Sequence, residues 1–163
     1  MKSLAAIALG SNLESKEIGN REANLREAIE RLRGLGEVRA VSSFYDTEPV
    51  GYVDQPRFLN GALLLETELQ PLELIRGLLE IERGMGRERE GAVAKGPRVI
   101  DLDLLLYGHS VMNTAELMLP HPEMQERRFV LEPLAEIAPG MVHPVLGVTV
   151  GEMLAGLSRG SSL

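Results

Sequence analysis

The 163-residue chain contains no cysteine and no tryptophan, and it has only three phenylalanines and three tyrosines. Without cysteine the chain has no disulfide, no thiolate ligand for zinc or an iron–sulfur cluster, and no cysteine nucleophile. Long apolar runs are also missing, because the apolar stretch at residues 4–9 is too short for a secretory signal or a membrane span. These absences predict a cytoplasmic protein whose redox chemistry, if it had any, would need a bound cofactor.

Basic residues are in the minority, with 17 Lys and Arg against 24 Asp and Glu, so the net charge is −7. No basic block offsets this charge, and a broad surface for nucleic acid or an anionic membrane is therefore not expected, although a local basic pocket stays open. The content of 44% hydrophobic and 25% charged residues is typical of a globular protein. The length predicts a single domain over residues 1–163, with a loose tail at residues 158–163.

Apolar periodicity and turn residues divide the chain into strands and helices. Strands are expected at residues 4–9, 38–45, 58–66 and 99–107, and helices at residues 20–33 and 71–84. This β-α-β-β-α-β order is that of the split βαβ, ferredoxin-like fold. The predicted fold class is α+β, an antiparallel sheet with helices packed on one face. Residues 123–138 and 150–157 are expected to add partly helical C-terminal embellishments.

Two carboxylates, Asp101 and Asp103, stand inside an otherwise apolar predicted strand. The two-residue period of a strand puts both on one face, with their Cα atoms about 6.6 Å apart. This spacing lets them hold metal ions about 3.5–4 Å from each other, and Mg²⁺ bound by carboxylates leaves its other positions to water and phosphate oxygens. The alternative is that both lie on the solvent face of an exposed strand.

Basic residues gather just before this strand, at Arg87, Arg89, Lys95 and Arg98, in a segment rich in glycine and alanine. Metal-binding carboxylates beside convergent arginines are what phosphoryl transfer requires, because charge spreads over the phosphate oxygens. The alternative is a solvated loop whose arginines form salt bridges. The P-loop and the dinucleotide-binding glycine motif are both absent.

Several short motifs spread over residues 4–157 are specific in combination. They are Ala8-Leu9-Gly10-Ser11-Asn12-Leu13, Ser42-Ser43-Phe44-Tyr45, Asp54-Gln55-Pro56, Phe58-Leu59-Asn60, Gly96-Pro97-Arg98 with Asp101-Leu102-Asp103, and Pro120-His121 with Arg127 and Phe129. Together they resemble the 6-hydroxymethyl-7,8-dihydropterin pyrophosphokinase family. The resemblance implies a ferredoxin-like fold and a Mg²⁺-dependent transfer of pyrophosphate from ATP to the pterin hydroxymethyl group, with release of AMP, in folate biosynthesis.

The resemblance also implies roles for individual residues. It makes Asp101 and Asp103 the ligands of two Mg²⁺ ions. It makes Arg87 and Arg98 the catalytic arginines and puts Arg89 on a loop that closes over ATP. The implied ATP site consists of Glu82, Arg87, Arg89, Arg98, Leu104, His121 and Arg127. The implied pterin pocket consists of Thr47, Val50, Phe58, Asn60 and Phe129. A flat heteroaromatic substrate suits an aromatic slot with an amide nearby, whereas the alternative for the two phenylalanines is an ordinary core position.

The expected partners are the substrates ATP and 6-hydroxymethyl-7,8-dihydropterin, and neither nucleic acid nor a membrane is expected. A monomer is the default and a weak dimer is the alternative. A non-catalytic ligand-sensing module is a competing function, since ferredoxin-like folds also host regulatory domains. An RNA-binding domain is a third, which the net charge and the lack of an aromatic and basic strand motif disfavour.

Overall fold

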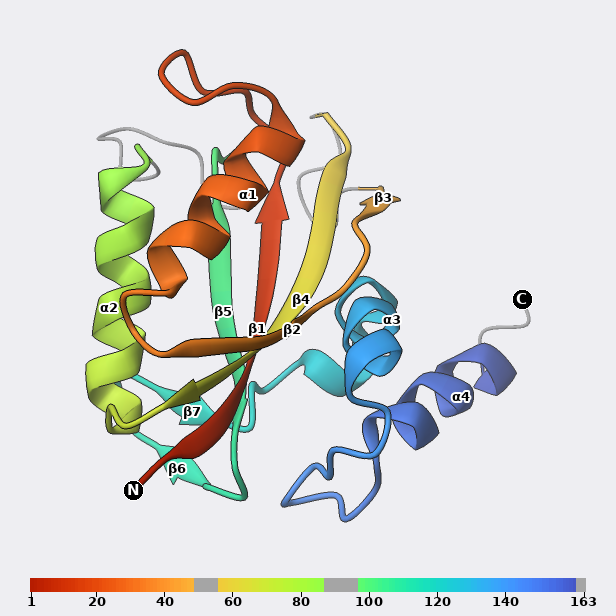
Figure 1. The fold of residues 1–163 in the computed structure, drawn as a ribbon. Coiled ribbons are helices and arrows are strands. Elements are labelled where there is room, and N and C mark those ends of the chain that lie inside the picture. The colour runs from red at the N-terminus through yellow and green to blue at the C-terminus, as the bar shows by residue number, and fades with distance from the viewer. Residues whose placement is uncertain (49–55, 87–96, 161–163) are drawn as a thin grey trace.

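A five-stranded antiparallel sheet forms the centre of the structure (Figure 1). This computed structural model describes residues 1–48, 56–86 and 97–160. The strands of the sheet are β1 (Ser3–Ser11), β2 (Glu37–Val41), β3 (Tyr45–Thr47), β4 (Phe58–Thr67) and β5 (Asp101–Tyr107). They follow the order β2-β4-β1-β5, and β3 pairs with the start of β4. The remaining elements are α1 (Arg21–Leu32), α2 (Pro71–Gly84), β6 (Met112–Asn113), β7 (Met118–Leu119), the 3₁₀ helix η1 (Met124–Glu126), α3 (Arg128–Ile137) and α4 (Val150–Gly160).

The arrangement confirms the predicted ferredoxin-like fold class. Strands β1, β2, β4 and β5 alternate with α1 and α2 in the split βαβ order, and every neighbouring pair in the sheet is antiparallel. The strand expected at residues 38–45 is instead two short strands. Ser42 lies between them, and its Oγ accepts the Ala62 N–H at 2.9 Å, so a side chain replaces one rung of the backbone ladder.

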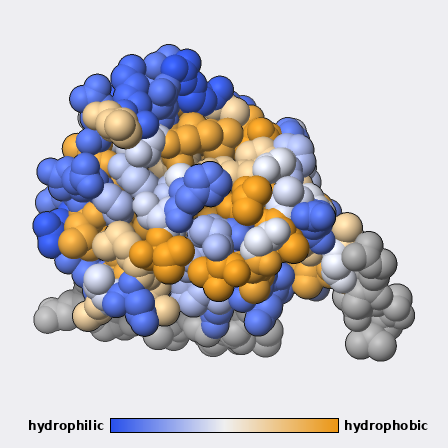
Figure 2. Space-filling model, turned by 90° about the horizontal axis from the view of Figure 1, so that it is seen from below, coloured by the Kyte–Doolittle hydropathy of each residue, from blue (hydrophilic) through white to orange (hydrophobic). Residues whose placement is uncertain are grey.

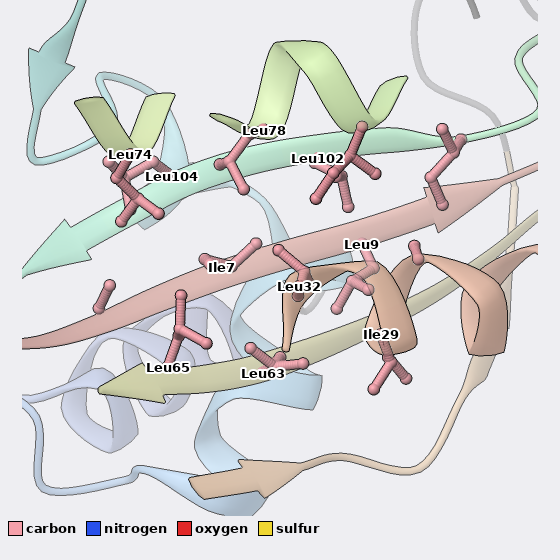
Figure 3. Close-up of a cluster of buried hydrophobic side chains, with 14 of the residues drawn as sticks. Ile7, Leu9, Ile29, Leu32, Leu63, Leu65, Leu74, Leu78, Leu102 and Leu104 are labelled. Atoms are coloured by element: carbon pink, nitrogen blue, oxygen red, sulfur yellow. The ribbon is translucent and has the colours of Figure 1, made fainter. Parts of the chain in front are cut away.

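One face of the sheet packs against α1 and α2. Alternate strand positions such as Ile7, Leu63 and Leu102 point to this side and meet Leu32 and Leu78 of the helices (Figure 3). All five side chains are buried. Burying one such side chain contributes about 1.5–3 kcal/mol, so this cluster accounts for much of the stability of the fold. The layer matches the helices that the sequence predicts.

The opposite face of the sheet is covered by α3, and α4 packs against α3 to complete a second helical layer (Figure 1). Small strand residues such as Ala6 and Ala62 leave room for Leu131 and Leu134 of α3, and all four are buried. The expectation of helices on one face is therefore incomplete, because the C-terminal helices complete a second core. Helix α4 continues past residue 157 to residue 160, and the rest of the expected tail, residues 161–163, lies outside the described residues.

The end of the molecule that carries β6 and β7 shows apolar patches between hydrophilic residues (Figure 2). Val111 and Met118, next to and within these strands, are 60% and 45% exposed. The last residues of β1 and the first residues of β4 and β5 lie together at the other end of the sheet. In the described part of the chain, no helix has both the length and the apolar composition needed to cross a membrane.

Candidate active site

A cavity of about 530 Å³ lies at the end of the sheet where β1 finishes and β4 and β5 begin. Its wall on the far side comes from residues 121–123 and the start of α3. Most site residues that the sequence predicts within the described ranges line it: Thr47, Phe58, Asn60, Arg98, Asp101, Asp103, His121, Arg127 and Phe129. Residues from all three predicted groups, those for metal, nucleotide and pterin, therefore share one cavity.

Asp101 and Asp103 project from β5 to the cavity side of the sheet, as the two-residue spacing predicts. Leu102 between them points into the core on the other side. Its backbone N–H donates a hydrogen bond of 2.7 Å to the carboxylate of Glu82 on α2. This bond ties the part of β5 between the two aspartates to α2. It therefore helps to hold both carboxylates in place.

The two carboxylates fit a hard divalent cation. Mg²⁺ in phosphoryl-transfer sites is held by one or two carboxylates and completes its shell with waters and substrate phosphates. Within the described ranges, no group of three or more His, Asp or Glu side chains converges on a point where it could hold a metal ion by itself. The donor set suits Mg²⁺ that is bound jointly with a phosphate, rather than a closed structural metal site.

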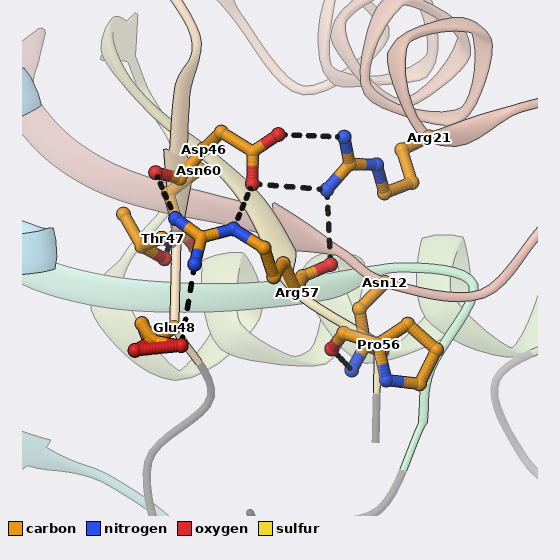
Figure 4. Close-up of polar contacts among 8 residues, drawn as sticks. All are labelled: Asn12, Arg21, Asp46, Thr47, Glu48, Pro56, Arg57 and Asn60. Atoms are coloured by element: carbon orange, nitrogen blue, oxygen red, sulfur yellow. Dashed lines mark hydrogen bonds and ion pairs between the residues drawn. The ribbon is translucent and has the colours of Figure 1, made fainter.

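The opposite part of the cavity is aromatic and amide-lined. Asn60, which is buried, donates from Nδ2 to the hydroxyl of Thr47 on the neighbouring strand (Figure 4). Phe58 pairs with Thr47 in the β3–β4 register and lies on the same side of β4 as Asn60. Phe129 comes from the first turn of α3. Both phenylalanines are half-buried and line the cavity, and Phe129 also packs against the core between the sheet and α3.

His121 forms part of the cavity wall and is held by two hydrogen bonds. Its backbone N–H donates to the Leu105 carbonyl at 2.9 Å, and its Nδ1 accepts from the Glu123 N–H at 3.3 Å. Burial and, to a smaller extent, the charge of Arg127 lower the pKa of His121. The ring is therefore neutral at pH 7 and carries its proton on Nε2, where it can donate a hydrogen bond.

Arg127 is fixed on two sides. It forms an ion pair with Glu123, and its guanidinium lies 5.6 Å from the centre of the Phe129 ring. Glu123 also lines the cavity, and the sequence analysis gives it no role. The sequence feature that points to Glu123 is its position four residues before Arg127, because opposite charges at this spacing lie close together on a helix.

Two of the predicted ATP residues do not line this cavity. Glu82 is only 3% exposed and lies on α2, and Leu104 is buried in the core between the sheet and that helix. Their implied roles stay predictions, supported by no contact with the cavity. Arg87, Arg89 and Val50 lie outside the described residues.

The cavity residues fall within a stretch that matches a known family. The sequence model for 7,8-dihydro-6-hydroxymethylpterin-pyrophosphokinase (HPPK) matches residues 6–139. The chain belongs to this family. The match includes every residue of the described cavity wall, from Ala8 to Val130.

Curated relatives agree with the HPPK assignment. A 2-amino-4-hydroxy-6-hydroxymethyldihydropteridine pyrophosphokinase of Bacillus subtilis is 49% identical over 139 residues, which are 84% of this chain and 79% of that protein. The Pseudomonas aeruginosa protein of the same name is 43% identical over 141 residues, 85% of this chain and 82% of that one. A folate synthesis bifunctional protein of Arabidopsis thaliana is 46% identical over 132 residues, 80% of this chain but 26% of that longer protein.

Solved structures share the HPPK fold. The crystal structure of Plasmodium falciparum HPPK-DHPS wild type with pteroate superposes with a TM-score of 0.75 and covers 98% of this chain and 43% of that one. The crystal structure of HPPK-DHPS in complex with substrates also gives a TM-score of 0.75, over 99% of this chain and 44% of that one. The sequence identities are 16% and 14%, so these likenesses establish the fold alone.

The half-buried His121 and the buried His143 predict how stability depends on pH. Burial lowers the pKa of both His121 and His143 in the folded chain, whereas an unfolded histidine keeps a pKa of about 6.5. The unfolded chain therefore binds more protons as the pH falls below 6.5, and the free energy of unfolding should decrease there. The slope is at most about 1.4 kcal/mol per pH unit for each histidine.

Denaturant unfolding at pH 7.5, 6.5 and 5.5 measures this dependence. His143→Gln should flatten it, since His143 is buried and its Nδ1 accepts from the backbone N–H groups of Val145 and Leu146. His109→Gln replaces an exposed histidine and is the control for the substitution itself. Equal stability of the wild type at all three pH values would contradict the prediction.

Proposed function

We propose that the described cavity is the active site in which this pyrophosphokinase transfers a pyrophosphate group from ATP to the hydroxymethyl group of 6-hydroxymethyl-7,8-dihydropterin, releasing AMP. The reaction belongs to folate biosynthesis, as the names of the relatives indicate. The observation that supports this site most directly is the meeting of two different surfaces in one cavity. Asp101, Asp103, Arg98 and Arg127 line the same cavity as Phe58, Phe129 and the buried amide of Asn60, and Arg127 itself lies over the Phe129 ring.

The aromatic part suits the pterin. Phe58 and Phe129 offer flat apolar surface for a heteroaromatic ring, and the amide of Asn60 can bond to ring nitrogens. Thr47 holds the Asn60 side chain through its hydroxyl, which limits the amide to one orientation. Val50 is assigned to the same pocket by family resemblance.

Gly10, for which the sequence predicts no role, leaves the space that this pocket needs. A Cβ here would lie 2.9 Å from Asn60 Oδ1 and 3.5 Å from Phe58 Cδ1. We expect Gly10→Ala to push the Asn60 amide aside and raise KM for the pterin about tenfold, which corresponds to about 1.4 kcal/mol, with little change in KM for ATP. Steady-state kinetics with each substrate varied in turn measures both constants.

Gly156→Ala is the control for that substitution, because a Cβ on Gly156 would have no neighbour within 4 Å. Both KM values of this variant should equal those of the wild type. A Gly10→Ala enzyme with an unchanged KM for the pterin would show that Gly10 does not shape the pterin pocket.

The charged part suits the triphosphate. Arg98 and Arg127 line it, and the neutral His121 can donate a hydrogen bond from Nε2. Guanidinium groups bind phosphate oxygens through paired N–H donors, and such contacts strengthen in a site that excludes water. Family resemblance adds Arg87, Arg89, Glu82 and Leu104 to the ATP-binding residues, with Arg87 and Arg98 stabilising charge on the oxygens of the transferred group.

Asp101 and Asp103 would hold two Mg²⁺ ions together with ATP. Bound Mg²⁺ neutralises phosphate charge and makes the attacking hydroxyl more acidic. The chain's own residues align the substrates, so that the pterin hydroxyl oxygen bonds to the β-phosphorus while the bond from that phosphorus to the AMP oxygen breaks. The mechanism requires no described side chain as a general base. The hydroxyl proton passes to solvent or to a phosphate oxygen.

One assay tests the proposal. The purified protein is incubated with ATP, Mg²⁺ and 6-hydroxymethyl-7,8-dihydropterin, and AMP and the pterin product are separated by chromatography, with EDTA and no-pterin controls. We expect AMP that depends on both the pterin and Mg²⁺. Formation of ADP instead would indicate simple kinase chemistry, and binding without turnover would indicate a ligand-sensing module.

The oligomeric state and the location remain predictions. A cytoplasmic monomer is the expectation from the sequence, with a weak dimer as the alternative. Size-exclusion chromatography with light scattering at two protein concentrations measures the mass directly.

A further inference from the structure

The side chain of Asn12 connects two segments that are far apart in the sequence. Asn12 follows the last residue of β1 and is 2% exposed. Its Oδ1 accepts the backbone N–H of Arg98 at 2.7 Å. Its Nδ2 donates to the Pro56 carbonyl at 3.0 Å (Figure 4). The Asn12 backbone N–H also donates to the Arg98 carbonyl at 3.0 Å. One buried amide thus bonds to both segments at once.

Each of these segments leads directly into a different part of the cavity. Arg98 lines the charged part and precedes Asp101 by three positions. Pro56 precedes Phe58, which lines the aromatic part, by two positions. The separation of Arg98 from Pro56 therefore affects where the charged and aromatic parts of the cavity lie relative to each other.

The segment that contains Pro56 is also held by contacts of the next residue, Arg57. The Arg21 guanidinium donates to the Arg57 carbonyl at 2.9 Å, and Arg57 Nε donates to Asp46 at 2.9 Å (Figure 4). This surface network fixes the start of β4 to α1 and β3. The Asn12 amide then connects this segment to the backbone of Arg98.

We propose that Asn12 is a positioning residue for the transfer reaction, whose Oδ1 sets the backbone of Arg98 and whose Nδ2 sets the start of β4. This inference rests on the proposed function of the cavity. Transfer between two bound substrates depends on their alignment, and a displacement of about 1 Å can cost about 100-fold in rate. A single amide shared by both segments keeps the arginine that faces the phosphates in register with the pterin pocket.

The test compares Asn12→Ala and Asn12→Asp with Asn24→Ala. Asn24 is a matched control, since it is also fully buried and its Nδ2 donates to Ser11 Oγ at 3.2 Å and to the Leu13 carbonyl at 3.0 Å. It touches neighbouring residues without bonding to Arg98 or Pro56. We expect Asn12→Ala to lower kcat by about 10–100-fold, while Asn24→Ala keeps kcat close to that of the wild type.

Asn12→Asp separates the two halves of the contact. It keeps an oxygen for the Arg98 N–H and loses the donor to the Pro56 carbonyl. We expect KM for the pterin to rise about tenfold, with a smaller loss of kcat than in Asn12→Ala. Pterin fluorescence titration gives the same shift as a Kd, so this part of the inference is measured without turnover. If Asn12→Ala does not fold, Asn12→Asp and this titration carry the test.

Thermal unfolding of every variant separates positioning from general stability. Unchanged kinetics and pterin Kd in both Asn12 variants of an active enzyme would overturn the inference and leave the proposed function intact. Losses in Asn12→Ala and Asn24→Ala that scale equally with lost stability would also overturn it. A wild type that binds the pterin but makes no AMP would refute the proposed function, whereas a weaker pterin Kd in Asn12→Asp would still support the role of Nδ2.

Discussion

Replacing Asp101 or Asp103 by asparagine should lower kcat/KM for pterin-dependent AMP formation by about 1,000-fold. The carboxylates face one cavity from the same side of β5, beside Arg98. Asparagine keeps the shape of the side chain but removes the charge that, in the proposed mechanism, would bind Mg²⁺ and offset the triphosphate. Charge stabilisation of this kind contributes several kcal/mol to a phosphoryl-transfer transition state, and each 1.4 kcal/mol is a factor of ten in rate.

A titration with Mg²⁺ makes this prediction specific to the metal. The Mg²⁺ concentration at half-maximal rate should rise in both variants, because the loss of a charged ligand weakens the binding of Mg²⁺ itself. Glu116→Gln is the charge-matched control, since Glu116 pairs with Arg76 on the surface and does not line the cavity. Its kinetics should match the wild type. Near-normal turnover of the aspartate variants at limiting Mg²⁺ would refute the metal assignment.

The placement of these aspartates is predictable from the sequence because strand periodicity is local. Asp101, Leu102 and Asp103 alternate between the cavity and the core in the structure, as a two-residue period requires. The same rule places Phe58 and Asn60 together on β4. A prediction of this kind succeeds since it needs only the direction of neighbouring side chains along one strand.

The second helical layer is harder to predict from local patterns. Helix α3 has Pro133 in its interior, a residue that weakens a helix on its own. The structure stabilises it by burying Leu131 and Leu134 against the small side chains of the sheet. The decisive information is therefore tertiary, namely that the sheet has a second apolar face to cover.

Contacts between distant residues limit the prediction of the site itself. Asn12 belongs to a motif that the sequence analysis identifies, yet its bond to Arg98 joins residues 86 positions apart. Glu82 shows the converse case. Family resemblance assigns it to ATP, while in the structure its carboxylate accepts the Leu102 N–H on β5, between the two aspartates. Neither spacing nor residue type reveals such pairings before the chain is folded.

Arg98, which bonds to Asn12, is the site of the second large effect. We expect Arg98→Ala to lower kcat by about 100–1,000-fold. Arg98 lines the charged part of the cavity, and its backbone is held on both its N–H and its carbonyl by Asn12. These bonds hold the Arg98 backbone beside the cavity, within reach of the phosphate oxygens on which charge develops in the proposed reaction. Removing one such donor from a closed site costs about 100–1,000-fold in rate.

Arg98→Lys tests whether charge alone is sufficient. Lysine keeps the positive charge but presents a point charge rather than a planar fork of N–H donors, so kcat should recover only in part. Arg76→Ala is the matched control, because Arg76 lies on α2 and pairs with Glu116 outside the cavity. Rapid-quench measurement of AMP in a single turnover reports the transfer step itself. If Arg98→Ala transferred pyrophosphate at the wild-type rate in that measurement, the charge on the phosphate oxygens would have to be stabilised by other groups.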